Sequence, residues 1–217
     1  MQLAIFDLDE TLINVDSDVE WGRFLNDEGV TGAKDRKSRN EIFYSQYKKG
    51  TLDINAYLEF VCEPLKELKL DSLLAYRKRF IEQRIKPNIL EKGQALLNVH
   101  RKAGHEILII TATIEFLTKP IASLMEVEHL IAPIPEFLDG SFTGRTIGTP
   151  SFGEGKVVRL TQWIENQNKI FDQVSFYSDS HNDLPLLLAV DNAIAVDPDP
   201  LLLEEAKKRD WSVISLR

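Results

Sequence analysis

Four short apolar runs, each followed at once by small, acidic or proline residues, limit the possible folds of this chain more than any other feature. The first run is Leu3 to Phe6, and it leads directly into an aspartate. An unbroken apolar run of this length suits a strand that is buried on both faces of a parallel sheet, whereas a surface strand alternates apolar and polar residues. The other three runs lie within residues 105–113, 173–180 and 192–200.

Helix-period apolar patterns occupy the sequence between and after these runs. Strand and helix therefore alternate, which is typical of an α/β fold with helices on both faces of a parallel sheet. The sequence predicts a doubly wound, Rossmann-like parallel sheet, with helices within residues 89–104, 113–125, 155–168 and 199–210.

Residues 15–85 interrupt this alternation, because they contain several segments with helical periodicity and none with the pattern of a strand. We expect a helical cap at 15–85, inserted after the first strand, and a core formed by residues 1–14 and 86–217. Later in the chain, Asp139 and Gly140 stand between apolar residues and favour the tight turn of a β-hairpin.

The composition excludes several classes of partner. Lys and Arg total 26 against 34 Asp and Glu, a net charge of -8 that repels polyanions, so we expect no nucleic-acid partner. Cys62 is the only cysteine and can form neither an internal disulfide nor a cysteine-based metal site. The sequence has no signal-like N-terminus and no apolar run of about 20 residues, which predicts a cytoplasmic location and no membrane partner.

Polar side chains follow the ends of the predicted strands. In an open parallel sheet ligands bind outside the carboxyl ends of the strands, so we expect these side chains to converge on one edge. They are Asp7 and Asp9 after the first strand, Thr111 and Thr113 after the second, Asp179 and Asp183 after the third, and Lys156 behind a glycine-containing loop.

Such a set of side chains has a definite chemistry. Crowded carboxylates repel one another unless a cation shares the site. Oxygen ligands without a nearby Cys or His cluster select a hard ion, and Mg²⁺ fits best. A lysine and a threonine hydroxyl suit phosphoryl oxygens, and a carboxylate beside the metal can attack phosphorus.

Four motifs occur in order: DLDET at residues 7–11, IITAT around Thr111, GEGK ending at Lys156, and SDSHND with Asp179 and Asp183. Together they make the chain resemble the haloacid dehalogenase-like superfamily, and within it the phosphoserine-phosphatase-like branch. The resemblance covers essentially the whole chain and implies a phosphoric monoester hydrolase. The helical insertion after the first motif matches the cap of that family.

The resemblance also implies a mechanism. Asp7 attacks the substrate phosphorus and becomes an aspartyl phosphate, and Asp9 protonates the leaving alkoxide and then takes a proton from water. Thr111 and Lys156 bind the phosphoryl oxygens. Because family ATPases carry a threonine where this chain has Asp9, the resemblance implies hydrolysis of a phosphomonoester.

By the same resemblance, Mg²⁺ is held by a carboxylate oxygen of Asp7, the backbone carbonyl of Asp9 and the side chain of Asp179. Asp183 completes the metal site by orienting that shell. Thr113 is expected to cap the following helix.

The leaving group is the least determined part of the hypothesis. Asp16, Asp18, Glu20 and Arg23 lie where the core joins the cap. In the resembling phosphoserine phosphatases a cap glutamate meets the substrate ammonium and an arginine meets its carboxylate, and Glu20 and Arg23 are the candidates for these roles. An acidic entrance equally suits a cationic alcohol such as histidinol phosphate.

We therefore expect the partner to be a small phosphomonoester that bears an amine, such as phosphoserine or histidinol phosphate. One alternative is a phosphotransferase that passes the phosphoryl group to an acceptor alcohol. The other is a non-catalytic phosphate-binding module. The second alternative usually requires the loss of a motif residue, and all of them are present.

Overall fold

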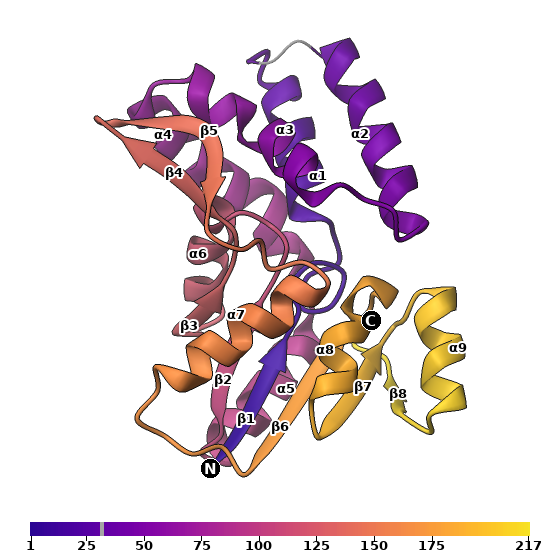
Figure 1. Cartoon of the computed structure of the whole chain (residues 1–217). Coiled ribbons are helices and arrows are strands. Elements are labelled where there is room, and N and C mark those ends of the chain that lie inside the picture. The colour runs from indigo at the N-terminus through magenta and orange to yellow at the C-terminus, as the bar shows by residue number, and fades with distance from the viewer. Residues whose placement is uncertain (31–32) are drawn as a thin grey trace.

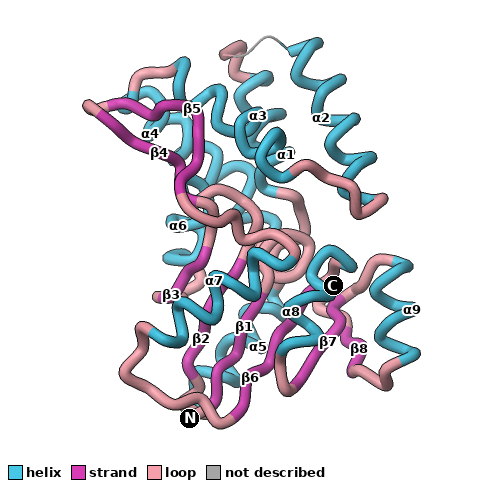
Figure 2. Tube along the Cα trace, viewed as in Figure 1, coloured by secondary structure: helices cyan, strands magenta, loops and turns pink. Residues whose placement is uncertain are grey.

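The computed structural model describes residues 1–30 and 33–217. Its centre is a six-stranded sheet in the order β3-β2-β1-β6-β7-β8, in which all neighbouring strands run parallel (Figures 1 and 2). The predicted parallel sheet is thus confirmed. Its strands are β1 (Gln2–Phe6), β2 (Glu106–Ile110), β3 (His129–Ile131), β6 (Gln173–Ser178), β7 (Asn192–Val196) and β8 (Ser212–Ile214).

The order of the strands creates a crevice beside β1. The chain passes from β1 outward to β2 and β3, and it then crosses to the other side of β1 to form β6, β7 and β8. β1 and β6 pair in register, with Phe6 opposite Tyr177. Doubly wound sheets bind ligands at such a reversal, outside the carboxyl ends of the strands. The residues that directly follow β1 and β6 meet at this edge.

The central position of β1 explains its unbroken apolar sequence. Leu3 and Ile5 belong to the hydrophobic core on one face of the sheet, and Ala4 and Phe6 belong to the core on the other face. Side chains alternate between the two faces along a strand, so a strand that is covered on both faces needs an apolar residue at every position.

Helices cover both faces of the sheet, as a doubly wound fold requires (Figure 1). Leu97 of α5 and Leu117 of α6 pack in the core that contains Phe6, and Leu160 of α7 and Leu186 of α8 pack in the core that contains Ile5. No helix in the described parts of the chain has the length and apolar character needed to cross a bilayer. The core helices are α5 (Glu91–Lys102), α6 (Glu115–Leu124), α7 (Glu154–Glu165), α8 (Leu184–Ala189) and α9 (Pro200–Lys208).

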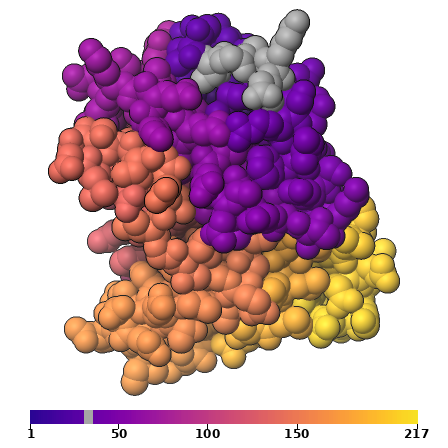
Figure 3. Space-filling model, turned by 45° about the horizontal axis from the view of Figure 1, so that its top comes forward, coloured from indigo at the N-terminus to yellow at the C-terminus, as the bar shows by residue number. Residues whose placement is uncertain are grey.

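Helices follow β1 across the range predicted to form a cap, and we refer to them as the cap. Its helices are α1 (Ser17–Asp27), α2 (Ala33–Lys48), α3 (Ile54–Glu67) and α4 (Leu70–Phe80), and a π-helical turn (Ile81–Ile85) and a 3-10 turn (Lys86–Asn88) lead back to the core. The ring of Trp21 lies 5.9 Å from that of Phe24 and 5.2 Å from that of Phe80, between centroids. Trp21 also packs against Phe116 of α6 at 6.1 Å, so the cap is seated directly on the core (Figure 3).

A β-hairpin from the later part of the chain joins the cap side of the molecule. It consists of β4 (Ile134–Leu138) and β5 (Ser141–Ile147), which pair antiparallel outside the main sheet. Asp139 and Gly140 form its turn with left-handed φ angles of 48° and 83°, as predicted for this pair. The hairpin packs on α3, where a Cβ at Gly144 would lie 3.1 Å from the side chain of Lys66. This side of the molecule therefore includes residues outside the predicted range 15–85.

Candidate active site

A tight turn after β1 carries the two aspartates of the first motif. The amide of Asp7 donates to the carbonyl of Tyr177 on β6 at 2.9 Å, which extends the pairing of the two strands by one residue. The carbonyl of Leu8 then accepts hydrogen bonds from the amides of residues 11–13 at 3.3, 2.8 and 3.2 Å. This turn ends the strand abruptly and leaves Asp7 and Asp9 at the crevice.

Lys156 reaches Asp7 from the start of α7. Its Nζ lies 2.8 Å from Oδ1 of Asp7 and 2.7 Å from Oδ1 of Asp183, and the lysine is only 2% exposed. The first turn of α7 needs glycine, because a Cβ at Gly155 would lie 2.0 Å from the carbonyl oxygen of Pro150. Burial lowers the pKa of Lys156, but the two carboxylates outweigh it and raise the pKa above its ordinary value, so the ammonium persists.

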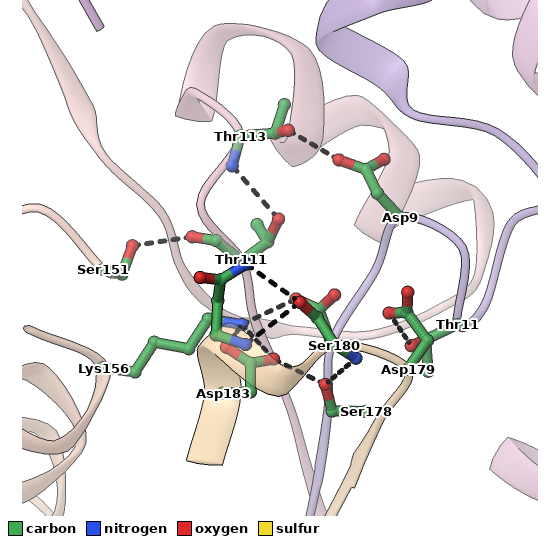
Figure 4. A network of polar contacts seen from close by, with 12 residues as sticks. Asp9, Thr11, Thr111, Thr113, Ser151, Lys156, Ser178, Asp179, Ser180 and Asp183 are labelled. Atoms are coloured by element: carbon green, nitrogen blue, oxygen red, sulfur yellow. Dashed lines mark hydrogen bonds and ion pairs between the residues drawn. The ribbon is translucent and has the colours of Figure 1, made fainter. Parts of the chain in front are cut away.

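Asp9 is held between the core and the cap (Figure 4). Its Oδ1 accepts a hydrogen bond from the amide of Ser17 at the start of α1, at 3.0 Å. Its Oδ2 accepts one from the hydroxyl of Thr113, at 2.6 Å. The predicted role of Thr113 as a helix cap was therefore wrong: Ile114 occupies the N-cap position of α6, without a side-chain hydrogen bond.

The two aspartates differ in acidity. Burial raises the pKa of Asp7 to about 6, against the lowering effect of the Lys156 ammonium. Burial raises the pKa of Asp9 to about 8, and the charge of Asp16 adds to this effect. At neutral pH the first is then mainly an anion and the second mainly an acid, which is the division that a nucleophile and a proton donor require.

Three carboxylates of this site face a single ammonium group. Burial, followed by the charges of Asp7 and Asp183, raises the pKa of Asp179 well above its ordinary value. Oδ1 of Asp179 accepts a hydrogen bond from Thr11 at 3.0 Å. Within hydrogen-bonding distance of the three carboxylates, the described residues supply one cation, that of Lys156. This excess of buried negative charge on oxygen donors fits a hard divalent cation.

The structure separates the roles of the acidic residues proposed to bind metal. The described ranges contain no group of three or more His, Cys, Asp or Glu side chains placed to hold an ion. Both oxygens of Asp183 are occupied: Lys156 contacts each of them, and Ser178 donates to Oδ2 at 2.6 Å. Asp183 therefore orients the lysine here, and Asp7, Asp179 and the carbonyl of Asp9 remain as candidate ligands.

Thr111 lies at the end of β2 and is 1% exposed. Its carbonyl accepts a hydrogen bond from Ser151 at 2.7 Å, and its Oγ1 accepts one from the amide of Thr113 at 3.2 Å. Ser151 lies in the loop that precedes α7, the helix that carries Lys156, so this bond ties the second motif to the third. The serine gave no signal in the sequence beyond its place before that loop.

One cavity of ≈ 350 Å³ brings the core motif residues together. Its volume lies within the range typical of sites for small molecules. The cap contributes Asp16 and Asp18 to the wall. The core residues in the wall are Asp7, Asp9, Thr111, Lys156, Asp179 and Asp183.

The structure does not bring Glu20 and Arg23 into this cavity. They line a neighbouring hollow, and their side chains form an ion pair with one another. The reason lies in the phase of α1, which begins at Ser17 and turns Asp18 inward. This placement does not support a contact of Glu20 and Arg23 with the leaving group, which stays a prediction.

Hydrogen bonds from the cap close one side of the site. The hydroxyl of Tyr47 on α2 donates to Oγ of Ser180 at 2.7 Å, and Nδ2 of Asn182 donates to the carbonyl of Tyr47 at 3.2 Å. Both core residues belong to the SDSHND motif. Tyr47 gave no distinct signal in the sequence, because an aromatic residue within a helix is ordinarily a packing residue.

Comparison with family models matches residues 4–188 to the haloacid dehalogenase-like hydrolases. This chain belongs to that family. The first, second and third motifs and the Asp179 cluster all lie inside the matched range. The hydrolase fold and its site therefore account for most of the sequence.

Individual relatives of the hydrolase agree with this assignment. A histidinol-phosphatase of Neisseria meningitidis is 41% identical over 219 residues, which cover 99% of both chains. A phosphoserine phosphatase of Mycobacterium tuberculosis is 28% identical over 220 residues, which cover 99% of this chain and 70% of the relative. A crystal structure of a protein from Bordetella pertussis Tohama I has a TM-score of 0.93 at 41% identity and covers 100% of this chain and 99% of its own.

A substrate-bound phosphoserine phosphatase has a TM-score of 0.72 at 18% identity, covers 100% of this chain and 93% of its own, and shares the fold. The matches confirm three predictions made from the sequence. They are the resemblance to the haloacid dehalogenase-like hydrolases, the α/β fold, and an enzyme of the phosphoric monoester hydrolase class.

Proposed function

We propose that the hydrolase cleaves the phosphomonoester of a small, amine-bearing alcohol through an aspartyl phosphate on Asp7, with the help of Mg²⁺. The observation that carries the proposal is the convergence of Asp7, Asp9 and Lys156 on one cavity, where burial raises the pKa of Asp9 more than that of Asp7. Lys156, 2.8 Å from Asp7, supplies the positive charge that phosphoryl oxygens need.

The first half of the reaction forms the phosphoenzyme. The Asp7 carboxylate attacks phosphorus, and the bond from phosphorus to the ester oxygen breaks. Asp9 gives its proton to the departing oxygen, which leaves as the alcohol. The hydroxyl of Thr113 keeps the Asp9 carboxyl oriented toward the cavity while this happens. Lys156 and Thr111 bind the phosphoryl oxygens.

The second half regenerates the enzyme. Asp9, now an anion, takes a proton from water as the water oxygen attacks phosphorus. The bond from phosphorus to Asp7 breaks, so inorganic phosphate leaves and the carboxylate is restored. Bound Mg²⁺, held by Asp7, Asp179 and the Asp9 carbonyl, would neutralise negative charge at the phosphoryl group.

The proposed substrate class rests on the cap. Asp16 and Asp18 line the cap side of the cavity, and a nearby cation stabilises the ionised form of their carboxyl groups, which favours an amine over a neutral alcohol. The 41% identical relative is named a histidinol-phosphatase and a more distant one a phosphoserine phosphatase, and both names describe amine-bearing esters. Histidinol phosphate and phosphoserine are therefore the first substrates to test.

The test is a screen of phosphorylated metabolites with Mg²⁺, scored by kcat/KM. An amine-bearing ester should rank first, and inorganic phosphate should appear in amounts equal to the alcohol. Phosphate transferred instead to an added alcohol would identify a phosphotransferase. A best substrate without a nitrogen atom would contradict the proposed class.

A further inference from the structure

Asp18 occupies a position on α1 where the helix otherwise buries apolar side chains. It lies three residues before Trp21 and seven before Leu25, on the same face of the helix. The exposed fractions of these three residues are 7%, 1% and 0%. A carboxylate therefore stands in the buried stripe of a cap helix, where the loss of water makes an ionised group costly.

One oxygen of this carboxylate has no partner. Asp18 lines the cavity that contains Asp7, and its Oδ1 is buried without a hydrogen bond. Asp16, by contrast, caps α1, and its Oδ1 accepts from the amide of Val19 at 2.9 Å. Burial raises the pKa of Asp18 well above its ordinary value, and the charges of Asp16 and Asp9 raise it further, whereas hydrogen bonds from the side chains of Thr113 and Tyr57 lower it. A donor that reached the carboxyl group from the cavity would satisfy the remaining oxygen.

Aromatic side chains of α2 and α3 form the wall of the cavity on the cap side. They are contributed by Phe43, Tyr44, Tyr47 and Tyr57. The rings of Phe43 and Tyr57 meet nearly edge to face, with 5.4 Å between their centroids. Aromatic faces attract cations and stack on flat rings, so the wall suits a protonated nitrogen or a flat heterocycle.

The cavity offers little to a substrate carboxylate. Among the described residues of the predicted cap range 15–85, Lys48 is the sole basic side chain in its wall, and it is exposed at the end of α2. On the core side Arg217 also lines the cavity, but its Nε donates to Asn14 at 2.7 Å and its Nη2 to the carbonyl of Glu10 at 3.0 Å. A carboxylate placed near Asp16 and Asp18 would meet two acidic side chains and would oppose their ionisation.

We infer that Asp18 determines specificity by accepting a hydrogen bond from a cationic nitrogen of the leaving group. The enzyme then selects phosphate esters of cationic alcohols that carry a flat ring and no carboxylate. The inference rests on the proposed function and adds to it the residue that recognises the amine. It also separates the two candidate substrates, because histidinol has an imidazole and no carboxylate, whereas serine has a carboxylate and no ring.

The test compares the wild type with Asp18→Asn, in Mg²⁺, on two esters of similar size. One is the phosphate ester of histidinol, and the other is 3-phenylpropyl phosphate, which has a ring but no nitrogen. For the histidinol ester kcat/KM should fall about tenfold or more, mainly through KM, because a hydrogen bond to a charged group is lost. For 3-phenylpropyl phosphate it should change by less than about twofold.

Two controls accompany the variant. Glu59→Gln removes a carboxylate from an exposed position of α3 and should match the wild type on both esters. Phosphoserine should be a poorer substrate of the wild type than the histidinol ester by about tenfold or more. A preference for phosphoserine would overturn the selection against carboxylates.

Calorimetric binding of histidinol gives a readout that does not depend on turnover. Asp18→Asn should weaken its Kd by about tenfold or more, whereas Glu59→Gln should not. Equal losses on both esters, or unchanged values on both together with unchanged binding, would overturn the role of Asp18. A wild type that hydrolyses neither ester would contradict the proposed function instead, and the binding of histidinol would still decide the role of Asp18.

Discussion

The hydroxyl of Thr113 donates a 2.6 Å hydrogen bond to Oδ2 of Asp9, across 104 positions of sequence. This bond joins the loop after β2 to the loop after β1. The other oxygen of Asp9, Oδ1, accepts a hydrogen bond from the amide of Ser17, so the carboxyl group is held from two sides. The proposed proton donor is thus oriented by the core and by the cap together.

Thr113→Val removes this hydrogen bond and keeps the branched shape of the side chain. We expect kcat/KM for an alkyl phosphate, which reports formation of the phosphoenzyme, to fall about tenfold, as part of the contribution of a positioned acid is lost. The kcat/KM for p-nitrophenyl phosphate, whose leaving group needs no proton, should fall less than about twofold. Thr118→Val is the control, because the Thr118 hydroxyl donates to the carbonyl of Ile114 and not to Asp9. Equal losses on both substrates would refute this role.

Lys156→Met leaves the buried carboxylates of Asp7 and Asp183 without their cation. Removal of one partner from a buried ion pair typically costs about 3–5 kcal/mol, so we expect a decrease of that size in the free energy of unfolding. Urea unfolding without added metal measures this free energy. The control Lys37→Met, at an exposed position of α2, should change the free energy of unfolding little. A Lys156→Met protein as stable as the wild type would show that the carboxylates are not charged in the fold.

Mg²⁺ should stabilise the folded protein, because an ion that binds only the folded state adds about 2.7 kcal/mol at one hundred times its Kd. Asp179→Asn should remove most of this effect, since the residue offers the candidate metal site a carboxylate repelled by Asp7 and Asp183. Thermal melting with MgCl₂, compared with NaCl at equal ionic strength, measures the difference. Chelator should abolish hydrolysis in the wild type. Full activity in excess chelator is the outcome that excludes the metal.

Asp18→Asn should stabilise the protein in the absence of substrate. Since burial raises the pKa of Asp18 in the folded chain, the unfolded chain loses its proton first as pH rises, and the wild type loses stability above about pH 4. Asparagine does not titrate, so the gain in Tm should be small near pH 4 and grow toward neutral pH. Thermal melts of both proteins between about pH 4 and neutral pH test this prediction. A variant with a lower Tm than the wild type at neutral pH would contradict it.

The sequence predicted the core of the site because its motif residues lie just after the predicted strands or at the start of a helix. A strand such as β1 ends where its apolar run ends, and Asp7 therefore lies at the sheet edge whatever the rest of the chain does. No pattern in the sequence indicated that the hairpin packs on the cap, because the contacting residues Gly144 and Lys66 are distant in sequence.

The cap residues show where reasoning from the sequence reached its limit. Glu20 and Arg23 were candidates by analogy, but the phase of α1 decides which side chains face the cavity. The buried stripe of Asp18, Trp21 and Leu25 can be read from the sequence as spacings of three and four residues, and an acidic residue within it was the available signal. The partner of Thr113 could not be found this way, because the hydrogen bond depends on the register between distant strands.

Transfer of the phosphoryl group to Asp7 is tested most directly by rapid acid quench during turnover of a ³²P-labelled phosphomonoester, followed by digestion and mass spectrometry. The label should appear on the peptide that contains Asp7, in an acid-stable and hydroxylamine-labile form. Asp7→Asn should carry no label and should lose several orders of magnitude in kcat, because the attacking oxygen anion is gone. Label on a serine, threonine or histidine, or rapid turnover without any labelled enzyme, would contradict a nucleophilic Asp7.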